Sequence, residues 1–269
     1  WVRIAGDPVR DKDEVLWTVV DITERVKAKD KIEQLASKLS RYLSPQVYQS
    51  IFSGKKNVKI EAYRKKLTVF FSDIKGFTEI TDRLEPEVLS TLLNSYLNEM
   101  SKIALKYGGT IDKFVGDAIL IFFGDPETKG EKEDAHSCVL MALEMQERMH
   151  HLKNLWEGQG ITNPLEIRIG INTGYCNVGN FGSENRLDYT IIGGEVNLAS
   201  RLESNAMTGQ ILISQETYAL IKKHIVCEKK DEIKVKGIAH KIQTYQVVGS
   251  YKNIAQKRKI LNETFDGFN

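Results

Sequence analysis

The sequence predicts an α/β (α+β) fold in which a mixed sheet carries helices on one face, and three observations support this. Strand-like apolar runs alternate with amphipathic helical segments over most of the chain. Several strands are joined by tight turns, which favours antiparallel neighbours over a doubly wound parallel sheet. Hydrophobic residues make up 41% and charged residues 28% of the 269 residues, as in proteins that bury a sizeable core.

The main domain, expected over residues 63–250, begins with the strand LTVFFSDI. A helix follows over residues 87–107, because apolar residues recur there at helical spacing and Gly108-Gly109 ends the pattern. The next elements are expected to be a hairpin of TIDKFVG and AILIFFG, which turns at Gly116-Asp117, and a helix over 134–151. The strands LEIRIGINTG and RLDYTIIGG follow, and then a helix over 195–205. The domain is expected to end with a strand QILIS, a helix over 215–224, and a closing hairpin of EIKVKG and KIQTYQVVG.

The first part of the chain has a different pattern. WVRIAG and EVLWTVVDI predict two strands joined by a polar turn. From Thr23 to Tyr42 the chain is charged and free of Gly and Pro, which predicts a helix capped by Thr23. A short coiled-coil seam and a surface helix packed on its own domain both fit this pattern, and we favour a dimerising helix. The seam residues are Ala28, Ile32, Leu35, Leu39 and Tyr42.

Charge and composition exclude several functions. A net charge of +2 indicates no general affinity for polyanions, so nucleic acid is not an expected partner. No apolar run approaches the roughly 20 residues that span a bilayer, so no membrane segment is expected in this fragment. The first residues are polar and lack Met, so we expect this chain to be a piece of a longer protein. A membrane segment elsewhere in that longer protein is compatible with this expectation. Three widely spaced cysteines without a CxxC pair favour a reducing, cytoplasmic setting.

Asp73 follows a strand-like run in the segment FFSDIKGFT, where a strand meets a Gly-bearing turn and then a helix. Such a turn presents unpaired backbone N–H groups to an anion. A carboxylate beside an anion site is explained if Mg²⁺ bridges the two. The alternative role of Asp73 is a helix N-cap.

Asp117 lies at the tip of the predicted hairpin FVGDAIL. An ordinary turn residue is the alternative, since Gly-Asp is common in turns. The apolar run AILIFF behind it argues against a solvent-facing turn, and a buried carboxylate is unfavourable without a positive partner. If this hairpin flanks the Asp73 strand, the two carboxylates are expected to hold two divalent ions, as in two-metal phosphoryl chemistry.

A third segment, RLDYTIIGGEVNLASRLES, places Asn197 and Arg201 four residues apart and therefore on one helix face. Arginine offers a planar donor fork for phosphate oxygens, and asparagine both donates and accepts at a sugar. A solvated helix face is the alternative. The apolar residues Val196, Leu198 and Leu202 mark the opposite side of the helix as core.

The segments FFSDIKGFT, GGTIDKFVGDAILIFFG, RIGINTG, DYTIIGGEVNLASRLE and VKG together resemble the class III nucleotidyl cyclase catalytic domain. They occur in that family's order and spacing over roughly residues 63–249. The resemblance implies a ferredoxin-like mixed sheet with helices. It also implies a catalytic centre that forms only at a head-to-tail dimer interface.

By this resemblance, one chain supplies the metal-binding Asp73 and Asp117, together with the backbone carbonyl of Ile74. The other chain supplies Asn197, which orients the ribose, and Arg201, which stabilises the transition state. A homodimer then holds two equivalent sites.

Base choice in this family depends on two positions, which correspond here to Lys113 and Thr190. Lysine with Asp or Thr is the adenylate cyclase pattern, whereas guanylate cyclases usually carry Glu with Cys. Lysine donates only, so it suits the adenine N1 acceptor and not the protonated N1 of guanine. The pair therefore favours ATP, and the alternatives are a surface lysine and an ordinary strand residue.

The resemblance also implies contacts to the triphosphate. Lys236 is the expected phosphate-binding lysine, with Lys234 as second choice, although both could equally be solvated. Gly194 departs from the family pattern, since many relatives carry Asp there. Backbone groups at the turn after Asp73 are expected to bind phosphate at Gly76, Phe77 and Thr78.

The segment WTVVDITER resembles the closing strand of a PAS-type sensor domain and the DIT motif that enters a signalling helix. We therefore expect a sensor remnant over residues 1–22, a dimerising signalling helix over 23–45, a linker over 46–62, and a tail over 251–269.

The sequence thus predicts an adenylate cyclase, a lyase that converts ATP to 3′,5′-cyclic AMP and pyrophosphate with two Mg²⁺ or Mn²⁺ ions per site. It is expected to act as a homodimer under an upstream sensor. A guanylate cyclase is one alternative, which Lys113 and Thr190 disfavour. A non-catalytic nucleotide-binding or dimerisation module is the other, disfavoured because degenerate relatives usually lose one of the four site residues retained here.

Overall fold

The computed structural model describes residues 1–8, 15–52, 60–158, 161, 165–235 and 241–251. It divides into two compact units, residues 1–49 and 50–269. Among the described residues, no helix has the length and apolar character needed to cross a bilayer.

The first unit contains the two expected strands and the expected helix. Strands β1 (Val2–Pro8) and β2 (Val15–Asp21) pair antiparallel, and α1 (Thr23–Leu39) follows with a short 3₁₀ turn, η1 (Ser40–Tyr42). The prediction that Thr23 caps α1 is wrong, because Thr23 is itself the first helical residue. Its backbone N–H donates to Asp21 Oδ1 at 2.8 Å, and hydrogen bonds from Thr23 lower the pKa of Asp21.

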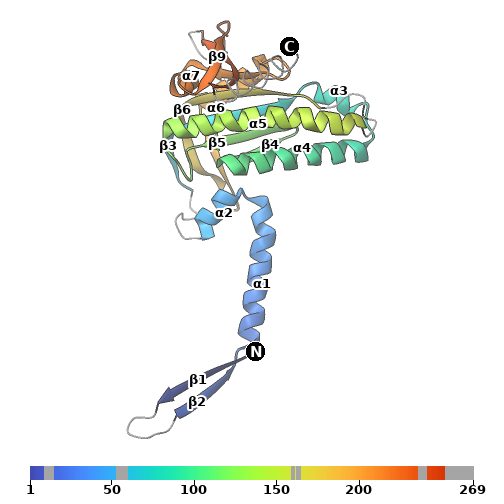
Figure 1. Cartoon of the computed structure of the whole chain (residues 1–269). Helices are drawn as coiled ribbons and strands as arrows, with labels where there is room; N and C mark the ends of the chain where they lie inside the picture. Colours follow the sequence, from blue (N-terminus) through green and yellow to red (C-terminus); the bar gives the residue numbers. More distant parts are fainter. Residues whose placement is uncertain (9–14, 53–59, 159–160, 162–164, 236–240, 252–269) are drawn as a thin grey trace, which may run out of the picture. The chain divides into compact units, whose positions relative to one another are not determined.

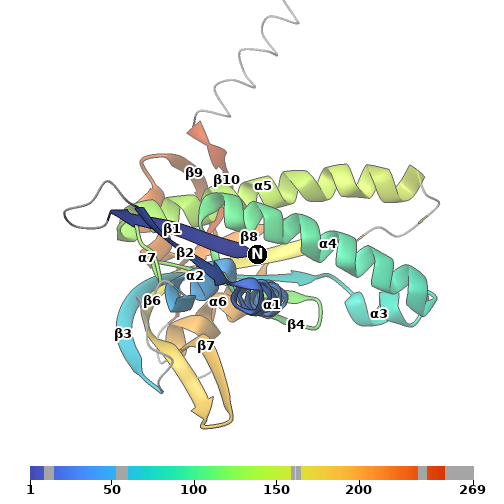
Figure 2. The ribbon, with the colours of Figure 1, turned by 90° about the horizontal axis from the view of Figure 1, so that it is seen from below.

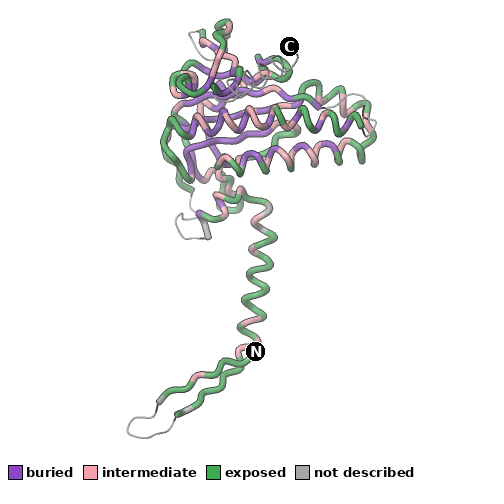
Figure 3. Tube along the Cα trace, in the orientation of Figure 1, coloured by how far each residue is buried: buried purple, intermediate pink, exposed green. Residues whose placement is uncertain are grey.

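The seam residues Ala28, Ile32 and Leu35 of α1 are exposed (Figure 3). Ile32 is 66% and Leu35 is 51% exposed. Helix α2 (Pro45–Phe52) occupies part of the segment expected to be a linker. Ser44 Oγ accepts the Val47 N–H at 3.3 Å, and Pro45 stands at the first helical position, so local capping explains this helix.

The second unit is built on an eight-stranded mixed sheet in the order β4-β5-β3-β6-β8-β10-β9, with β7 also paired to β6. The β6–β8 pairing is parallel, and the other described pairings are antiparallel. This confirms the predicted mixed α+β architecture. The strands are β3 (Ala62–Ile74), β4 (Thr110–Val115), β5 (Ala118–Phe123), β6 (Ile167–Ser183), β7 (Arg186–Ile192), β8 (Ile211–Ser214), β9 (Ile225–Lys229) and β10 (Thr244–Ser250).

Helices cover both faces of this sheet, not one face as predicted. Helices α4 and α5 run side by side across one face (Figure 1), where they bury Phe70 and Ile74 of β3. Helix α6 packs on the opposite face, over Leu67 and Val69. The helices are α3 (Phe77–Thr81), α4 (Pro86–Tyr107), α5 (Glu131–Gly158), α6 (Gly194–Asn205) and α7 (Gln215–Ile221).

Gly170 explains how closely α6 approaches the sheet. A Cβ at this β6 position would lie 2.1 Å from the backbone nitrogen of Glu203 and 2.3 Å from the carbonyl oxygen of Ala199. Both atoms belong to the backbone of α6, so only glycine allows this contact. The short separation sets α6 directly behind the strand ends that carry the candidate site.

Strands β6 and β10 differ from the prediction in where they end or in what they pair with. Strand β6 does not end at the Gly turn of INTG but continues to Ser183, because it pairs first with β3 and then with β7. Figure 2 shows the β6–β7 hairpin reaching away from the sheet. Strand β10 pairs with β9 rather than with EIKVKG, where the described residues contribute only the bridge between Ile233 and Ile242.

Candidate active site

The two aspartates singled out in the sequence lie at neighbouring strand ends. Asp73 is the penultimate residue of β3, and Asp117 lies in the tight turn between β4 and β5. Because β5 pairs antiparallel with β3, this turn lies beside the end of β3. The backbone N–H of Ile74 donates to Asp117 Oδ2 at 3.1 Å, so the structure brings Asp73, Ile74 and Asp117 together.

The carboxylates of Asp73 and Asp117 interact unfavourably when both are ionised. Partial burial, followed by the neighbouring Asp73 carboxyl group, raises the pKa of Asp117 to about 6. Two carboxylates and the Ile74 carbonyl offer the oxygen ligands that Mg²⁺ and Mn²⁺ prefer, and a cation between them would remove the repulsion. The residues therefore fit a divalent metal.

This donor set is small. Among the described residues, no group of three or more His, Cys, Asp or Glu side chains is arranged to hold a metal ion. A cation at Asp73 and Asp117 would therefore take its remaining ligands from the backbone, from water and from substrate phosphates, as Mg²⁺ commonly does.

Arg168 and Glu203 connect Asp73 to α6, and sequence reasoning missed both residues. Arg168 lies opposite Asp73 in the β3–β6 register, with its Nη2 3.1 Å from Asp73 Oδ2 and its Nε 2.5 Å from Glu203 Oε1. The side chain of Glu203 is 7% exposed, and burial raises its pKa. Arg168 belongs to the RIGINTG motif, but only the strand register reveals its partner.

Asn197 and Arg201 lie on the exposed face of α6, while Leu198 and Leu202 are buried on the other side. In the described part of the chain, no hydrogen bond or ion pair engages either polar side chain, and none joins them to Asp73 or to its neighbours. The exposed pair is therefore available to groups outside this chain.

Lys113 and Thr190 come together through a residue that sequence reasoning did not single out. Thr190 Oγ1 donates to Asp112 Oδ2 at 2.6 Å, and Lys113 Nζ lies 3.3 Å from Asp112 Oδ1. The β4–β5 register shifts between Ile111 and Lys113, which is a β-bulge at Asp112. A bulge turns a side chain away from strict alternation, which allows Asp112 to reach β7.

A second buried carboxylate holds β7 beside this contact. Asp125 is almost fully buried and accepts hydrogen bonds from the hydroxyl groups of Tyr63, at 2.5 Å, and of Tyr189. Lys65 Nζ lies 2.9 Å from the same carboxylate. Tyr189 precedes Thr190, so two adjacent residues of β7 are each fixed by a buried aspartate.

The turn after Asp73 has the expected form. Gly76 has φ of 68°, a left-handed conformation that favours glycine, and α3 starts at Phe77. The first N–H groups of a helix have no intrahelical partner, which suits the predicted phosphate role of Gly76, Phe77 and Thr78. The predicted phosphate ligand Lys236 lies outside the described residues. Lys234 is described, and no described contact links it to the site.

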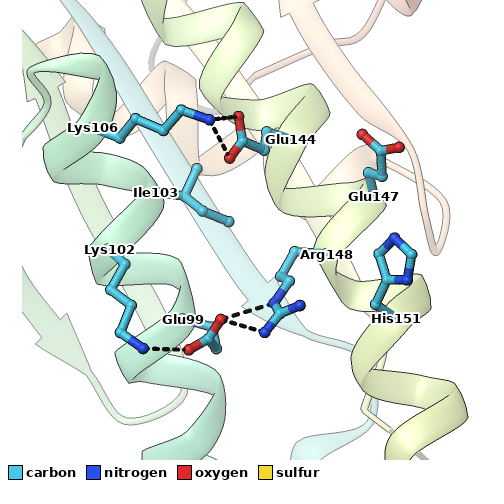
Figure 4. Close-up of a pocket in the computed structure, with 8 residues that line it drawn as sticks. All are labelled: Glu99, Lys102, Ile103, Lys106, Glu144, Glu147, Arg148 and His151. Atoms are coloured by element: carbon cyan, nitrogen blue, oxygen red, sulfur yellow. Dashed lines mark hydrogen bonds and ion pairs between the residues drawn. The ribbon is translucent and has the colours of Figure 1, made fainter.

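A hollow of about 440 Å³ lies between α4 and α5 (Figure 4), and none of the predicted site residues that the structure describes lines it. Several of its charged side chains form ion pairs, within α4 or between α4 and α5. Glu99 contacts both Lys102 and Arg148, and Lys106 contacts Glu144. The full lining is Glu99, Lys102, Ile103, Lys106, Glu144, Glu147, Arg148 and His151.

The mixed sheet and its flanking helices are those of a class III nucleotidyl cyclase catalytic domain. Residues 58–249 match the family described as Adenylate and Guanylate cyclase catalytic domain, so the chain belongs to that family.

Among solved structures, the chain is similar to the adenylyl cyclase CyaB from P. aeruginosa, with 64% identity and a TM-score of 0.70 over 71% of this chain and 97% of that one. It is also similar to the guanylyl cyclase Cya2, with 36% identity and a TM-score of 0.68 over 71% of this chain and 95% of that one.

Among curated proteins, the chain is 34% identical over 225 residues to the terminal-differentiation-specific adenylate cyclase of Dictyostelium discoideum. The match covers 81% of this chain and 10% of that protein. An adenylate cyclase of Anabaena cylindrica is 29% identical over 81% of this chain and 44% of its own length. The chain thus spans less than half of each of these relatives.

Proposed function

We propose that this chain is the catalytic region of an adenylate cyclase that converts ATP to 3′,5′-cyclic AMP and pyrophosphate at a homodimer interface. One observation carries the proposal. Asp73 and Asp117 form a metal-compatible pair, whereas Asn197 and Arg201 are exposed on α6 and contact neither aspartate within the described chain. A second copy that brings its own α6 to the carboxylates would complete the site.

Asp73, Asp117 and the Ile74 carbonyl would hold two Mg²⁺ or Mn²⁺ ions. When bound, such ions lower the pKa of the ribose 3′-hydroxyl and offset the charge of the triphosphate. The raised pKa of Asp117 supports this assignment, because it arises from burial first and then from the neighbouring Asp73 carboxyl group, and a bound cation would offset both effects. Arg168 balances Asp73 only in part, since it also pairs with Glu203.

The other groups act on the substrate directly. Asn197 of the second chain orients the ribose, so that the 3′-oxygen attacks the α-phosphorus in line with the departing pyrophosphate. Arg201 of that chain donates to the phosphoryl oxygens, where negative charge builds in the transition state. The backbone from Gly76 to Thr78 binds the triphosphate, with Lys236 as a further phosphate ligand.

Lys113 and Thr190 select the base. Their approach through Asp112 supports this role, because it places a cationic donor and a hydroxyl group at one locus. The ammonium group of Lys113 suits adenine N1 and repels the protonated N1 of guanine. Because the chain is also similar to the guanylyl cyclase Cya2, GTP is the alternative substrate. Comparing the turnover of ATP with that of GTP decides between the two.

We also propose that α1 sets how two catalytic domains meet, and that the preceding strands are the end of a PAS-type sensor domain in a longer protein. The exposed apolar seam of α1 supports a second copy as its partner. Use of ATP and three free cysteines support a cytoplasmic catalytic domain.

The first test is product analysis of the purified chain with Mn²⁺ and either ATP or GTP. The proposal expects cyclic AMP and pyrophosphate from ATP, with a higher kcat/KM than for GTP. A chain that converts neither nucleotide would refute the cyclase assignment for this protein, and a preference for GTP would make it a guanylate cyclase.

The shared site is tested by mixing two inactive variants, Asp73→Ala and Arg201→Ala. A mixed dimer keeps one intact site, because the wild-type aspartates of one chain meet the wild-type arginine of the other. Random pairing makes half of the dimers mixed, so activity should recover to about a quarter of the wild-type level when each site acts alone. No recovery would refute a site shared between chains.

A further inference from the structure

Asp112 is buried where the two proposed base-selecting residues meet. Its side chain is 1% exposed, whereas the neighbouring Lys113 side chain is 43% exposed. Asp112 Oδ2 accepts from Thr190 Oγ1 at 2.6 Å and from the Ile191 backbone N–H at 3.2 Å. Asp112 Oδ1 faces Lys113 Nζ at 3.3 Å. Three donors from β4 and β7 thus converge on one carboxyl group.

This arrangement determines whether the Thr190 hydroxyl group acts as a hydrogen-bond donor or as an acceptor toward a further ligand. A hydroxyl has one proton and two lone pairs, so it normally both donates and accepts. Asp112 Oδ2 accepts a hydrogen bond from the Ile191 N–H, and the Thr190 hydroxyl group donates its proton to the same oxygen. Only the lone pairs of Thr190 remain for another ligand. Thr190 consequently acts as an acceptor toward any group that reaches it.

Adenine and guanine differ at the position that such an acceptor would read. The exocyclic amino group of adenine donates at C6, whereas guanine carries a carbonyl oxygen there, which only accepts. An acceptor therefore pairs with adenine and repels guanine. A freely rotating threonine hydroxyl would serve either base.

We propose that Asp112 is a specificity-determining positioning residue: it fixes the Thr190 hydroxyl as an acceptor and draws Lys113 beside it, so that the pair reads adenine. The inference rests on the proposed function and goes beyond it in one respect. It assigns the preference for ATP to a buried residue that does not itself touch the base. Thr190 is 6% exposed in the isolated chain, so the base would approach it along the exposed flank of Lys113.

Burial raises the pKa of Asp112, and hydrogen bonds from Thr190 and Ile191 together with the Lys113 charge oppose that rise. The argument applies to the ionised carboxylate, because both of its oxygens can then only accept hydrogen bonds from Thr190 and Ile191.

The test compares kcat/KM for ATP with kcat/KM for GTP in the wild type, Asp112→Leu and Asp112→Asn. Leucine keeps the branched shape but removes both acceptors, whereas asparagine keeps one acceptor oxygen for Thr190. The ATP-to-GTP ratio should fall roughly three- to tenfold in Asp112→Leu, the effect of about one hydrogen bond, and less in Asp112→Asn. Asp188→Asn changes an exposed carboxylate on β7, the strand of Thr190, and should leave the ratio unchanged.

A purely structural role of Asp112 would lower both kcat/KM values together and leave their ratio at the wild-type value, which would overturn the proposal. The same ratio is measured after Asp112→Leu in a Thr190→Val background, where no hydroxyl remains to be oriented. Any further fall in the ratio should be smaller there, because only the contact of Asp112 with Lys113 is then lost. A further fall of similar size would show that Asp112 does not act through Thr190.

Purine riboside triphosphate, which lacks the amino group of adenine, tests the contact in the wild type without a variant that must fold. Wild type should prefer ATP over this analogue, and Thr190→Val should lose that preference. Equal use of ATP and the analogue by wild type would overturn the inference while leaving the cyclase assignment intact. If wild type turns over no nucleotide, the proposed function fails, and calorimetric binding of ATP, GTP and the analogue makes the same comparison.

Discussion

Arg168 lies directly opposite Asp73 in the sheet, and its guanidinium group joins that carboxylate to the buried Glu203 of α6. The candidate metal ligand on β3 and the helix that carries Asn197 and Arg201 are therefore linked through one arginine. Any shift of α6 against the sheet would change the charge environment of Asp73.

Replacing Arg168 by Met should destabilise the fold by about 2–4 kcal/mol, because it leaves the Glu203 carboxylate buried without its cation. Urea unfolding measures this change. Arg148→Met removes an arginine from a partly exposed ion pair with Glu99 and should change stability by about 1 kcal/mol or less. Arg168→Met with Glu203→Met should recover much of the lost stability, and equal losses in the single and double variants would contradict the pairing.

Asp117 should make the metal-free protein less stable as pH rises. Its folded pKa of about 6 lies above the ordinary value near 3.8, so the folded state binds the proton more tightly than the unfolded state. Its contribution to stability is full below about pH 4 and is lost as pH rises through about 6. Asp117→Asn should therefore gain stability over wild type across this window.

Thermal unfolding in EDTA from pH 4 to pH 8 measures that difference, which should grow with pH. Mn²⁺ should then raise the Tm of wild type at pH 7.5 and have little effect on Asp117→Asn, since ligand binding stabilises only a protein that retains the site. A constant difference between the two proteins at all pH values would contradict the raised pKa of Asp117.

Gly170 should not tolerate even a methyl group. Gly170→Ala would drive a Cβ into the backbone of α6, and we expect a loss of about 1–3 kcal/mol or more in unfolding free energy, together with a loss of activity. Gly194→Ala at the start of the same helix provides a control, because its Cβ would meet nothing within 4 Å. It should change stability by about 0.5 kcal/mol or less. Equal effects of the two substitutions would contradict the packing of α6 on β6.

Charge on the α1 seam should weaken association between chains. Ile32→Lys with Leu35→Lys places two like charges on the exposed seam and should shift sedimentation toward monomer, with a matching fall in specific activity at low protein concentration. Gln34→Lys adds a charge to α1 outside the seam and should leave association unchanged. Dimerisation insensitive to both changes would show that α1 is not the dimer contact.

The sequence alone was enough for the fold class and for the two aspartates. Alternation of apolar runs predicts strands and helices locally, and tight Gly turns predict which strands are antiparallel neighbours. The β4–β5 hairpin and the end of β3 were predictable for this reason, and with them the pairing of Asp73 with Asp117.

Tertiary structure alone decided the contacts that depend on strand register and layer order. Periodicity cannot show that β6 places Arg168 opposite Asp73, that α6 lies on the face away from α4, or that a bulge turns Asp112 toward Thr190. Each of these contacts joins residues distant in sequence, and a one-residue change of register would reverse the side-chain faces. Local pattern therefore predicts that the two aspartates lie together, whereas the contacts of Arg168 and Asp112 could be found only in the assembled sheet.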